Sequence, residues 1–121
     1  MRVLGFSLKW PKLRQPEFTT FRLRRRDKDW QVGELAQVVI KPRSKEREVM
    51  GPAEILTKEP RRLLGSSARH YQYITTSEAV ADGFSSLSDM EAWLLKAHGS
   101  RVLEEPINKL TLRWVNGENT A

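Results

Sequence analysis

The sequence contains no cysteine, and this absence removes several classes of site. Disulfide bonds, zinc–thiolate sites, iron–sulfur clusters and cysteine nucleophiles are all excluded. With two histidines in the whole chain, a histidine-rich metal site is excluded as well. Neither a Gly-rich phosphate loop nor a nucleophile elbow occurs in the sequence. We therefore expect no metal site and no cofactor.

Long apolar runs are also missing. No stretch approaches the ~18 consecutive apolar residues of a membrane span, and no apolar run follows the first charged residue as it would in a signal peptide. The length of 121 residues fits one domain. We expect a cytoplasmic protein with a single domain over residues 1–116 and a short flexible tail over residues 117–121.

Charge, by contrast, is abundant and unevenly distributed. The formal net charge is +6 and the sequence pI is about 10.0. Residues 1–70 carry 17 Lys and Arg against 8 Asp and Glu, whereas residues 71–121 carry 4 against 7. A basic half indicates a polyanionic partner for one side of the molecule.

The most informative segment is residues 18–28, an alternating run that leads into a basic cluster. If residues 18–24 form a strand, Thr20, Arg22 and Arg24 share one face, because successive side chains point to opposite sides. Arginine presents a rigid fork of donors that matches phosphate oxygens, so this face indicates a pocket for a phosphate-bearing ligand. The alternative is a solvated strand face that ends in a charged turn. The cations of the segment are Arg22, Arg24, Arg25, Arg26 and Lys28.

The remaining elements follow from apolar periodicity and from turn residues. We expect further strands over residues 2–8, 35–41, 48–57 and 109–115, with a bulge or bend at Gly51-Pro52. A helical turn is expected over 60–64, a short helix over 78–81 capped by Thr76 or Ser77 and ended by Gly83, and a helix from the Ser86–Asp89 cap through His98. In that last helix Met90, Trp93, Leu94 and Ala97 form a core-facing stripe. The order of the elements predicts an α+β domain with a small curled sheet or barrel.

Several of these segments together resemble the ASCH domain, a family of the PUA-like superfamily. They are the run Thr20-Phe21-Arg22, the turn Trp30–Glu34, a valine-rich strand and the segment Ser77–Ser86 before a helix. The resemblance extends from about Leu4 to Val115. It implies a small PUA-like β-barrel of about five or six strands with two or three helices. It also implies a cleft that binds RNA or a modified nucleoside.

One branch of this family resembles bacterial acetylcytidine amidohydrolases and carries Lys-x-x-Thr-x-Arg on the strand, with an acidic residue before the helix. On this chain the pattern places the threonine at Thr20, the arginine at Arg22 and the acid at Asp82, but it places Glu17 where the lysine belongs. A carboxylate there reverses the charge, so it would not stabilise a developing anion. Lys9 or Lys12 from a neighbouring loop is the alternative source of the missing ammonium group.

Two functions are therefore expected, in order. The first is a non-enzymatic RNA- or nucleotide-binding module, and the second is a small amidohydrolase for an acylated nucleoside, or a ribonuclease, with Glu17, Thr20 and Asp82 as the catalytic candidates. A protein-interaction domain is a third possibility without a specific motif. Trp10 and Trp30 are candidate stacking platforms for a base, or else tryptophans that cover the core. The expected ligand-binding residues are Thr20, Arg22, Arg24, Arg25, Arg26, Lys28, Trp30 and Asp82.

Overall fold

The computed structural model describes residues 1–115. The predicted tail over 117–121 lies outside these described residues. In chain order the elements are β1 (Arg2–Phe6), η1 (Pro11–Arg14), β2 (Glu17–Leu23), β3 (Leu35–Ile40), β4 (Glu48–Arg62), β5 (Gln72–Tyr73), α1 (Thr76–Asp82), α2 (Leu87–His98), η2 (Gly99–Leu103) and β6 (Ile107–Trp114), where η marks a 3-10 helix.

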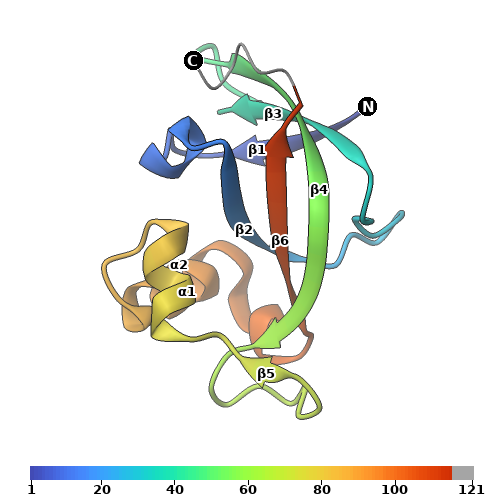
Figure 1. The fold of residues 1–121 in the computed structure, drawn as a ribbon. Helices are drawn as coiled ribbons and strands as arrows, with labels where there is room; N and C mark the ends of the chain where they lie inside the picture. The colour runs from blue at the N-terminus through green and yellow to red at the C-terminus, as the bar shows by residue number, and fades with distance from the viewer. Residues whose placement is uncertain (116–121) are drawn as a thin grey trace.

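All the strands belong to one mixed sheet in the order β1-β3-β4-β6-β2, and short β5 pairs with the end of β4. β1 runs parallel to β3, whereas the β3–β4, β4–β6 and β6–β2 pairs are antiparallel. The long strand β4 bends, so the sheet curls into a half-barrel whose edges are β1 and β2 (Figure 1). This arrangement confirms the predicted α+β fold, a small barrel-like sheet of five or six strands with two or three helices.

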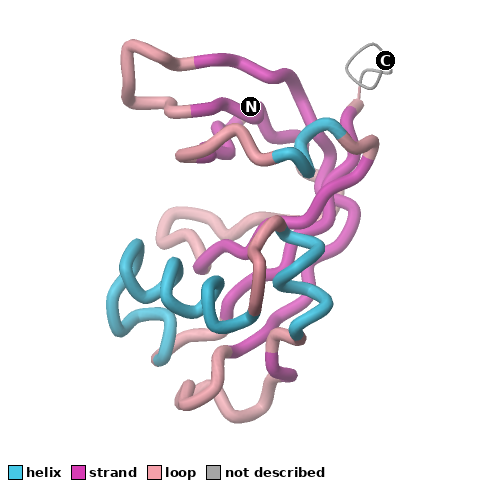
Figure 2. The backbone as a smooth tube through the Cα atoms, turned by 90° about the vertical axis from the view of Figure 1, so that its left-hand side faces the viewer, coloured by secondary structure: helices cyan, strands magenta, loops and turns pink. Residues whose placement is uncertain are grey.

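The apolar core is divided into two clusters. One lies inside the curl of the sheet and includes Leu4, Phe18 and Trp114. The other, including Phe21 and Met90, lies where α1, α2 and η2 pack against the ends of β2 and β6. In Figure 2 the β3–β4 hairpin and α2 project from the sheet in the same direction, at its two ends, while α1 overlaps the sheet in this view. The molecule therefore has two packed ends joined by the sheet.

Most of the predicted elements occur, and the differences have physical causes. The helical turn expected over 60–64 is wrong, because β4 continues to Arg62 and pairs with β6 as far as Arg61 opposite Ile107. Tertiary strand pairing thus outweighs the local preference of Pro60. The bulge expected at Gly51-Pro52 occurs just before it: the β3–β4 register shifts between Val49 and Gly51, which makes Met50 the extra residue, and Gly51 has φ of +123°.

The first helix, α1, is capped one or two residues earlier than predicted. Its cap is Thr75, not Thr76 or Ser77: the Thr75 hydroxyl accepts a hydrogen bond from the Glu78 backbone N–H at 3.1 Å. The Glu78 carboxylate accepts the Thr75 backbone N–H at 2.9 Å in return, which completes a capping box. The second helix begins after Ser86 and ends at Gly99, as predicted. None of the helices within residues 1–115 is long and apolar enough to cross a membrane.

Candidate functional site

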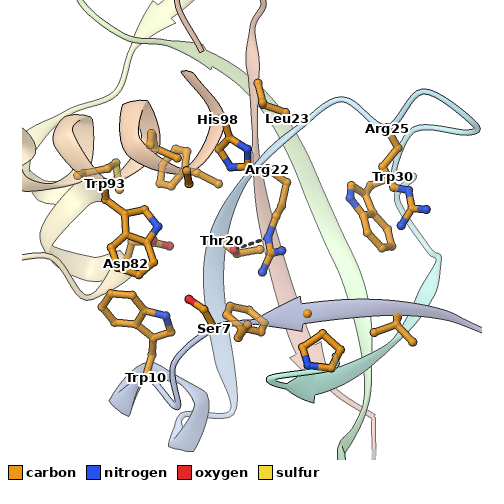
Figure 3. A pocket seen from close by; sticks show the side chains of 18 of the residues that line it. Ser7, Trp10, Thr20, Arg22, Leu23, Arg25, Trp30, Asp82, Trp93 and His98 are labelled. Carbon is orange, nitrogen blue, oxygen red and sulfur yellow. Dashed lines mark hydrogen bonds between the residues drawn. The ribbon is translucent and has the colours of Figure 1, made fainter. Parts of the chain in front are cut away.

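A cavity of about 990 Å³ opens between the two free edges of the half-barrel. Its walls come from β1, β2, the loop after β3 and the inner face of α2. Figure 3 shows how the labelled side chains are distributed along it: Trp10, Asp82 and Trp93 at one end, Thr20 and Arg22 in the middle, and Arg25 with Trp30 at the other end. A sheet that does not close into a full barrel thus leaves an open, side-chain-lined cleft.

Positive charge dominates the lining of this cleft. Within the described part of the chain, eight Lys and Arg side chains line it, against a single carboxylate, Asp82. Four of the eight form ion pairs with carboxylates: Lys12, Arg25, Lys41 and Arg101. The other four form no ion pair with a described residue: Arg22, Arg24, Arg26 and Arg43. The cleft therefore carries excess positive charge that a bound anion would compensate.

Arg22 lies in the middle of the cleft. Its Nε–H donates a hydrogen bond to the Thr20 hydroxyl at 3.0 Å, and its guanidinium lies 4.6 Å from the centre of the Phe6 ring. Burial lowers the pKa of Arg22 to about 10, a shift that nearby Asp82 opposes. The Thr20 bond fixes the direction of the fork while the two Nη groups make no hydrogen bond to a described residue. A partly desolvated guanidinium that is oriented but unpaired is suited to receive an anion.

A buried ion pair closes one end of the cleft. The Lys12 ammonium lies 2.9 Å from the Asp82 carboxylate, and each side chain is only 7 % exposed. The Thr19 hydroxyl donates to the same carboxylate oxygen at 3.2 Å. Burial raises the pKa of Asp82 and lowers that of Lys12, in each case against the attraction of the partner. The pair thus holds two titratable groups whose charged forms are both costly to bury.

The aromatic side chains Trp10, Phe84 and Trp93 pack together beside this ion pair. The ring centres lie 5.2 Å apart for Trp10 and Phe84, and 5.7 Å apart for Trp10 and Trp93. Gly83 makes the packing possible: a Cβ there would lie 2.7 Å from the Trp10 ring. Trp93 was predicted to be a core residue, and this is wrong, because it lines the cleft and is 38 % exposed. It leaves an aromatic surface open to a ligand.

His98 ends α2 on the same side of the cleft as Arg22. Burial lowers the pKa of the imidazole, and the neighbouring charges of Arg22 and Arg101 lower it further. At neutral pH the ring is therefore mainly uncharged. It adds a polar group to the lining without adding a fixed charge.

The structure brings most of the expected ligand-binding residues together. Thr20, Asp82 and Trp30 line the cleft, as do the arginines 22 and 24–26. Trp30 is buried, with the guanidinium of Arg2 at 4.5 Å from its ring centre, so it fits the expected alternative of a tryptophan that covers the core. Lys28 is exposed and is not among the lining residues.

Glu17 lies elsewhere. It starts β2, is exposed, and pairs in the sheet opposite Arg113, outside the lining of the cleft. The ammonium group next to Asp82 comes from Lys12, which the sequence offered as an alternative. It reaches the site because η1 follows β1 and turns back along β2. No spacing rule within one strand would have found it.

Sequence reasoning does not identify three of the lining residues. Trp93 belongs to the predicted core stripe of the helix and His98 to its predicted end, while Phe84 falls within the segment Ser77–Ser86 without a predicted role of its own. Thr19 was also missed as the hydroxyl that bonds Asp82, since the pattern pointed to Thr20. No signal in the sequence distinguishes a core-facing stripe from a cleft-facing one when both lie on the same helix.

No group of three or more His, Asp or Glu side chains within residues 1–115 is arranged to hold a metal ion. Comparison with known proteins gave no match: no family model, no curated protein and no solved structure is significantly similar to this chain.

Proposed function

We propose that the cleft binds a phosphate-bearing nucleotide, presented by RNA. The single observation that carries this proposal is the geometry at Arg22, whose half-buried guanidinium is oriented by Thr20 and has no carboxylate partner among the described residues. Desolvation strengthens its attraction for an anion, because little water remains to screen the charge. The resemblance to the ASCH domain points to the same class of ligand.

The other end of the cleft is suited to a base. Trp93 offers a partly exposed ring next to Trp10, and a base that stacks on such a ring gains ~1–3 kcal/mol. The Lys12–Asp82 pair lies beside these rings and presents both a donor and an acceptor. A base edge carries both hydrogen-bond donors and acceptors, whereas an ionised carboxylate or phosphate oxygen only accepts. The cleft therefore combines the two parts that a nucleotide needs.

The arginines at the mouth of the cleft supply attraction without sequence preference. Arg24 and Arg26 are exposed and form no ion pair with a described residue. Exposed cations of this kind contact the phosphate backbone and make binding sensitive to salt. Recognition would then depend on the cleft, and long-range attraction on its rim.

Calorimetric titration with a nucleoside monophosphate tests the proposal. Arg22→Gln keeps a polar side chain that reaches Thr20 but removes the charge. Loss of a charge-assisted hydrogen bond, ~1.5–3 kcal/mol, should weaken binding about tenfold to a hundredfold. Arg113→Gln is the matched control, because Arg113 is exposed and outside the cleft. Equal affinities for the parent and Arg22→Gln would contradict the proposal.

A second candidate function, amide hydrolysis of an N-acylated nucleoside, is favoured by the Lys12–Asp82 pair. Burial lowers the pKa of Lys12, which increases the fraction of neutral amine able to act as a base. Neutral Lys12 would accept a proton from water as its oxygen adds to the acyl carbonyl. Arg22 would donate hydrogen bonds to the oxyanion. The C–N bond would then break, and the proton held by Lys12 would pass to the leaving amine.

Chromatographic analysis of the products tests whether the protein hydrolyses an N-acylated nucleoside. An N-acylated nucleoside incubated with the protein should yield the free amine and the carboxylic acid. Lys12→Met should abolish turnover, while Glu17→Gln, a control outside the cleft, should retain it. If the parent forms no product, or if Lys12→Met is as active as the parent, the hydrolase reading is rejected and the binding reading remains.

A further inference from the structure

We infer that the ligand is a single RNA strand of several nucleotides, held on both sides of the cleft, rather than a free mononucleotide. The second holding element is the loop of residues 41–47 between β3 and β4, which we call the basic hairpin. This inference rests on the proposed function and names the form of its ligand. Two observations support it: the contacts that fix the position of the basic hairpin, and the positive charges on its surface that are unpaired within residues 1–115.

The basic hairpin is fixed against the wall of the cleft. The Lys41 backbone N–H donates to the Phe6 carbonyl of β1 at 2.7 Å, and Pro42 packs so closely on Gly5 that a Cβ there would lie 2.9 Å from the proline ring. Within the loop, the Ser44 backbone N–H donates to the Lys41 carbonyl at 3.0 Å. Lys41 also has a positive φ of 48°. The loop is thus held at one position above β1.

This fixed loop carries cations with no ion-pair partner in the part of the chain that the structure describes. Arg43, Lys45 and Arg47 are exposed and form no ion pair with a described residue, whereas Lys41 pairs with Glu46 inside the loop. Residues 41–44 line the cleft directly. A loop whose structure depends on its own backbone hydrogen bonds does not need these charges for folding. They are therefore available to an external anion.

The opposite rim carries a matching set of charges. Arg24 and Arg26 lie at the end of β2, across the cleft from the basic hairpin, and Arg22 lies between the two rims. Within the described residues, the one carboxylate of the lining, Asp82, is bound to Lys12 at the far end of the cleft. Glu105 pairs with Arg101 beside Arg24 and Arg26, and Glu46 pairs with Lys41, so each rim has one carboxylate against several cations. One phosphate at Arg22 would leave this excess rim charge uncompensated. A strand with a phosphate on each nucleotide would supply all three positions.

A single strand fits this arrangement better than a duplex. Arg22 lies inside the cleft and is half-buried, so the nucleotide that reaches it must leave a base stack. The helix beside the cleft, α2, carries one lysine and two acids and offers no basic face to a groove. The strand would pass from one rim to the other and place one nucleotide in the cleft.

Fluorescence anisotropy with a labelled single-stranded RNA tests the inference. The RNA has roughly ten nucleotides, a length within the range that single-strand sites cover. A nucleoside monophosphate is titrated in parallel by calorimetry. The variant K45Q/R47Q removes two charges from the part of the basic hairpin that does not line the cleft. The control R69Q/R113Q removes the same charge from other positions outside the cleft. Each lost phosphate contact should lower the slope of log affinity against log salt by about 0.7.

We expect the hairpin variant to bind the RNA at least tenfold more weakly, with a salt slope lower by about 1.4, and to bind the monophosphate like the parent, because neither Lys45 nor Arg47 lines the cleft. The control should bind both like the parent. Equal RNA affinity for the hairpin variant and the control would overturn the inference, as would equally tight hairpin-dependent binding of polyglutamate. Normal monophosphate binding would then leave the proposed function standing. Equal affinity of the parent and Arg22→Gln for the monophosphate would instead contradict the proposed function.

Discussion

Removal of the Lys12 ammonium is the perturbation whose size the structure defines best. Lys12 and Asp82 are 2.9 Å apart and 7 % exposed each, so neither gains much solvation when its partner is lost. Breaking such a pair from one side typically costs ~3–5 kcal/mol, because a buried charge is left without compensation. Asp82 is also the last residue of α1, where the helix dipole disfavours a negative charge. We therefore expect Lys12→Met to lose about 3–5 kcal/mol of unfolding free energy near neutral pH.

The pH dependence of this loss follows from the pKa of Asp82. Burial already raises that pKa in the folded parent, and removal of the Lys12 charge raises it further. Between the unfolded pKa, ~3.9, and the raised folded pKa, the folded variant holds a proton that the unfolded chain has released. Its stability therefore falls as pH rises through this window, by at most ~1.4 kcal/mol per pH unit. Below the window the variant should approach the parent.

Urea unfolding followed by far-UV circular dichroism at a series of pH values measures both quantities. The double variant K12M/D82L removes both charges and should recover most of the loss, because an apolar pair of similar size avoids the desolvation cost. The reasoning is refuted if Lys12→Met unfolds within ~1 kcal/mol of the parent at neutral pH. A loss that does not change between acidic and neutral pH would also refute it, since it would then come from packing alone.

Three further predictions concern the cleft. Trp93→Leu keeps apolar contact with Trp10 but should weaken nucleotide binding about tenfold in a titration, one stacked base being worth ~1–3 kcal/mol; unchanged affinity would remove Trp93 from the site. The pKa of His98, lowered now by burial and by Arg22, should rise when a nucleoside monophosphate binds, and NMR titration with and without ligand reads this directly; an unchanged pKa would exclude a phosphate near Arg22. Gly83→Ala should lose ~1–2 kcal/mol from the left-handed backbone, φ +116°, and displace Trp10; a parent-like Tm and tryptophan emission would contradict the packing described.

The strands and the main helix could be predicted because their signals are local. Leu110, Leu112 and Trp114 alternate with polar residues, and all three are buried as predicted. Ser86 and Gly99 mark the ends of α2 through capping chemistry that needs no distant partner. The continuation of β4 past Thr57 depends instead on pairing with β6, a long-range contact that has no signature in the segment itself.

In the candidate site, too, residues of one element could be predicted together, whereas contacts between distant elements could not. Thr20 and Arg22 belong to one strand, so alternation alone places them on one face, and the structure places both in the cleft. Asp82 and Lys12 are 70 positions apart in the chain, and only the fold brings their charges together. Trp93 differs from the buried Met90 and Leu94 of the same helix only in which neighbour faces it. Such a difference is set by packing between elements, which periodicity does not record.

NMR of the arginine Nε–Hε groups shows whether the Arg22 guanidinium receives the phosphate of a nucleotide. The Arg22 Nε–H is bonded to Thr20 and partly shielded from water, so its signal should exchange more slowly than those of the exposed arginines. We expect this signal to shift saturably with a nucleoside monophosphate, and to shift far less with the unphosphorylated nucleoside. Shifts confined to exposed arginines such as Arg24 and Arg26, with the Arg22 signal unchanged, would contradict it.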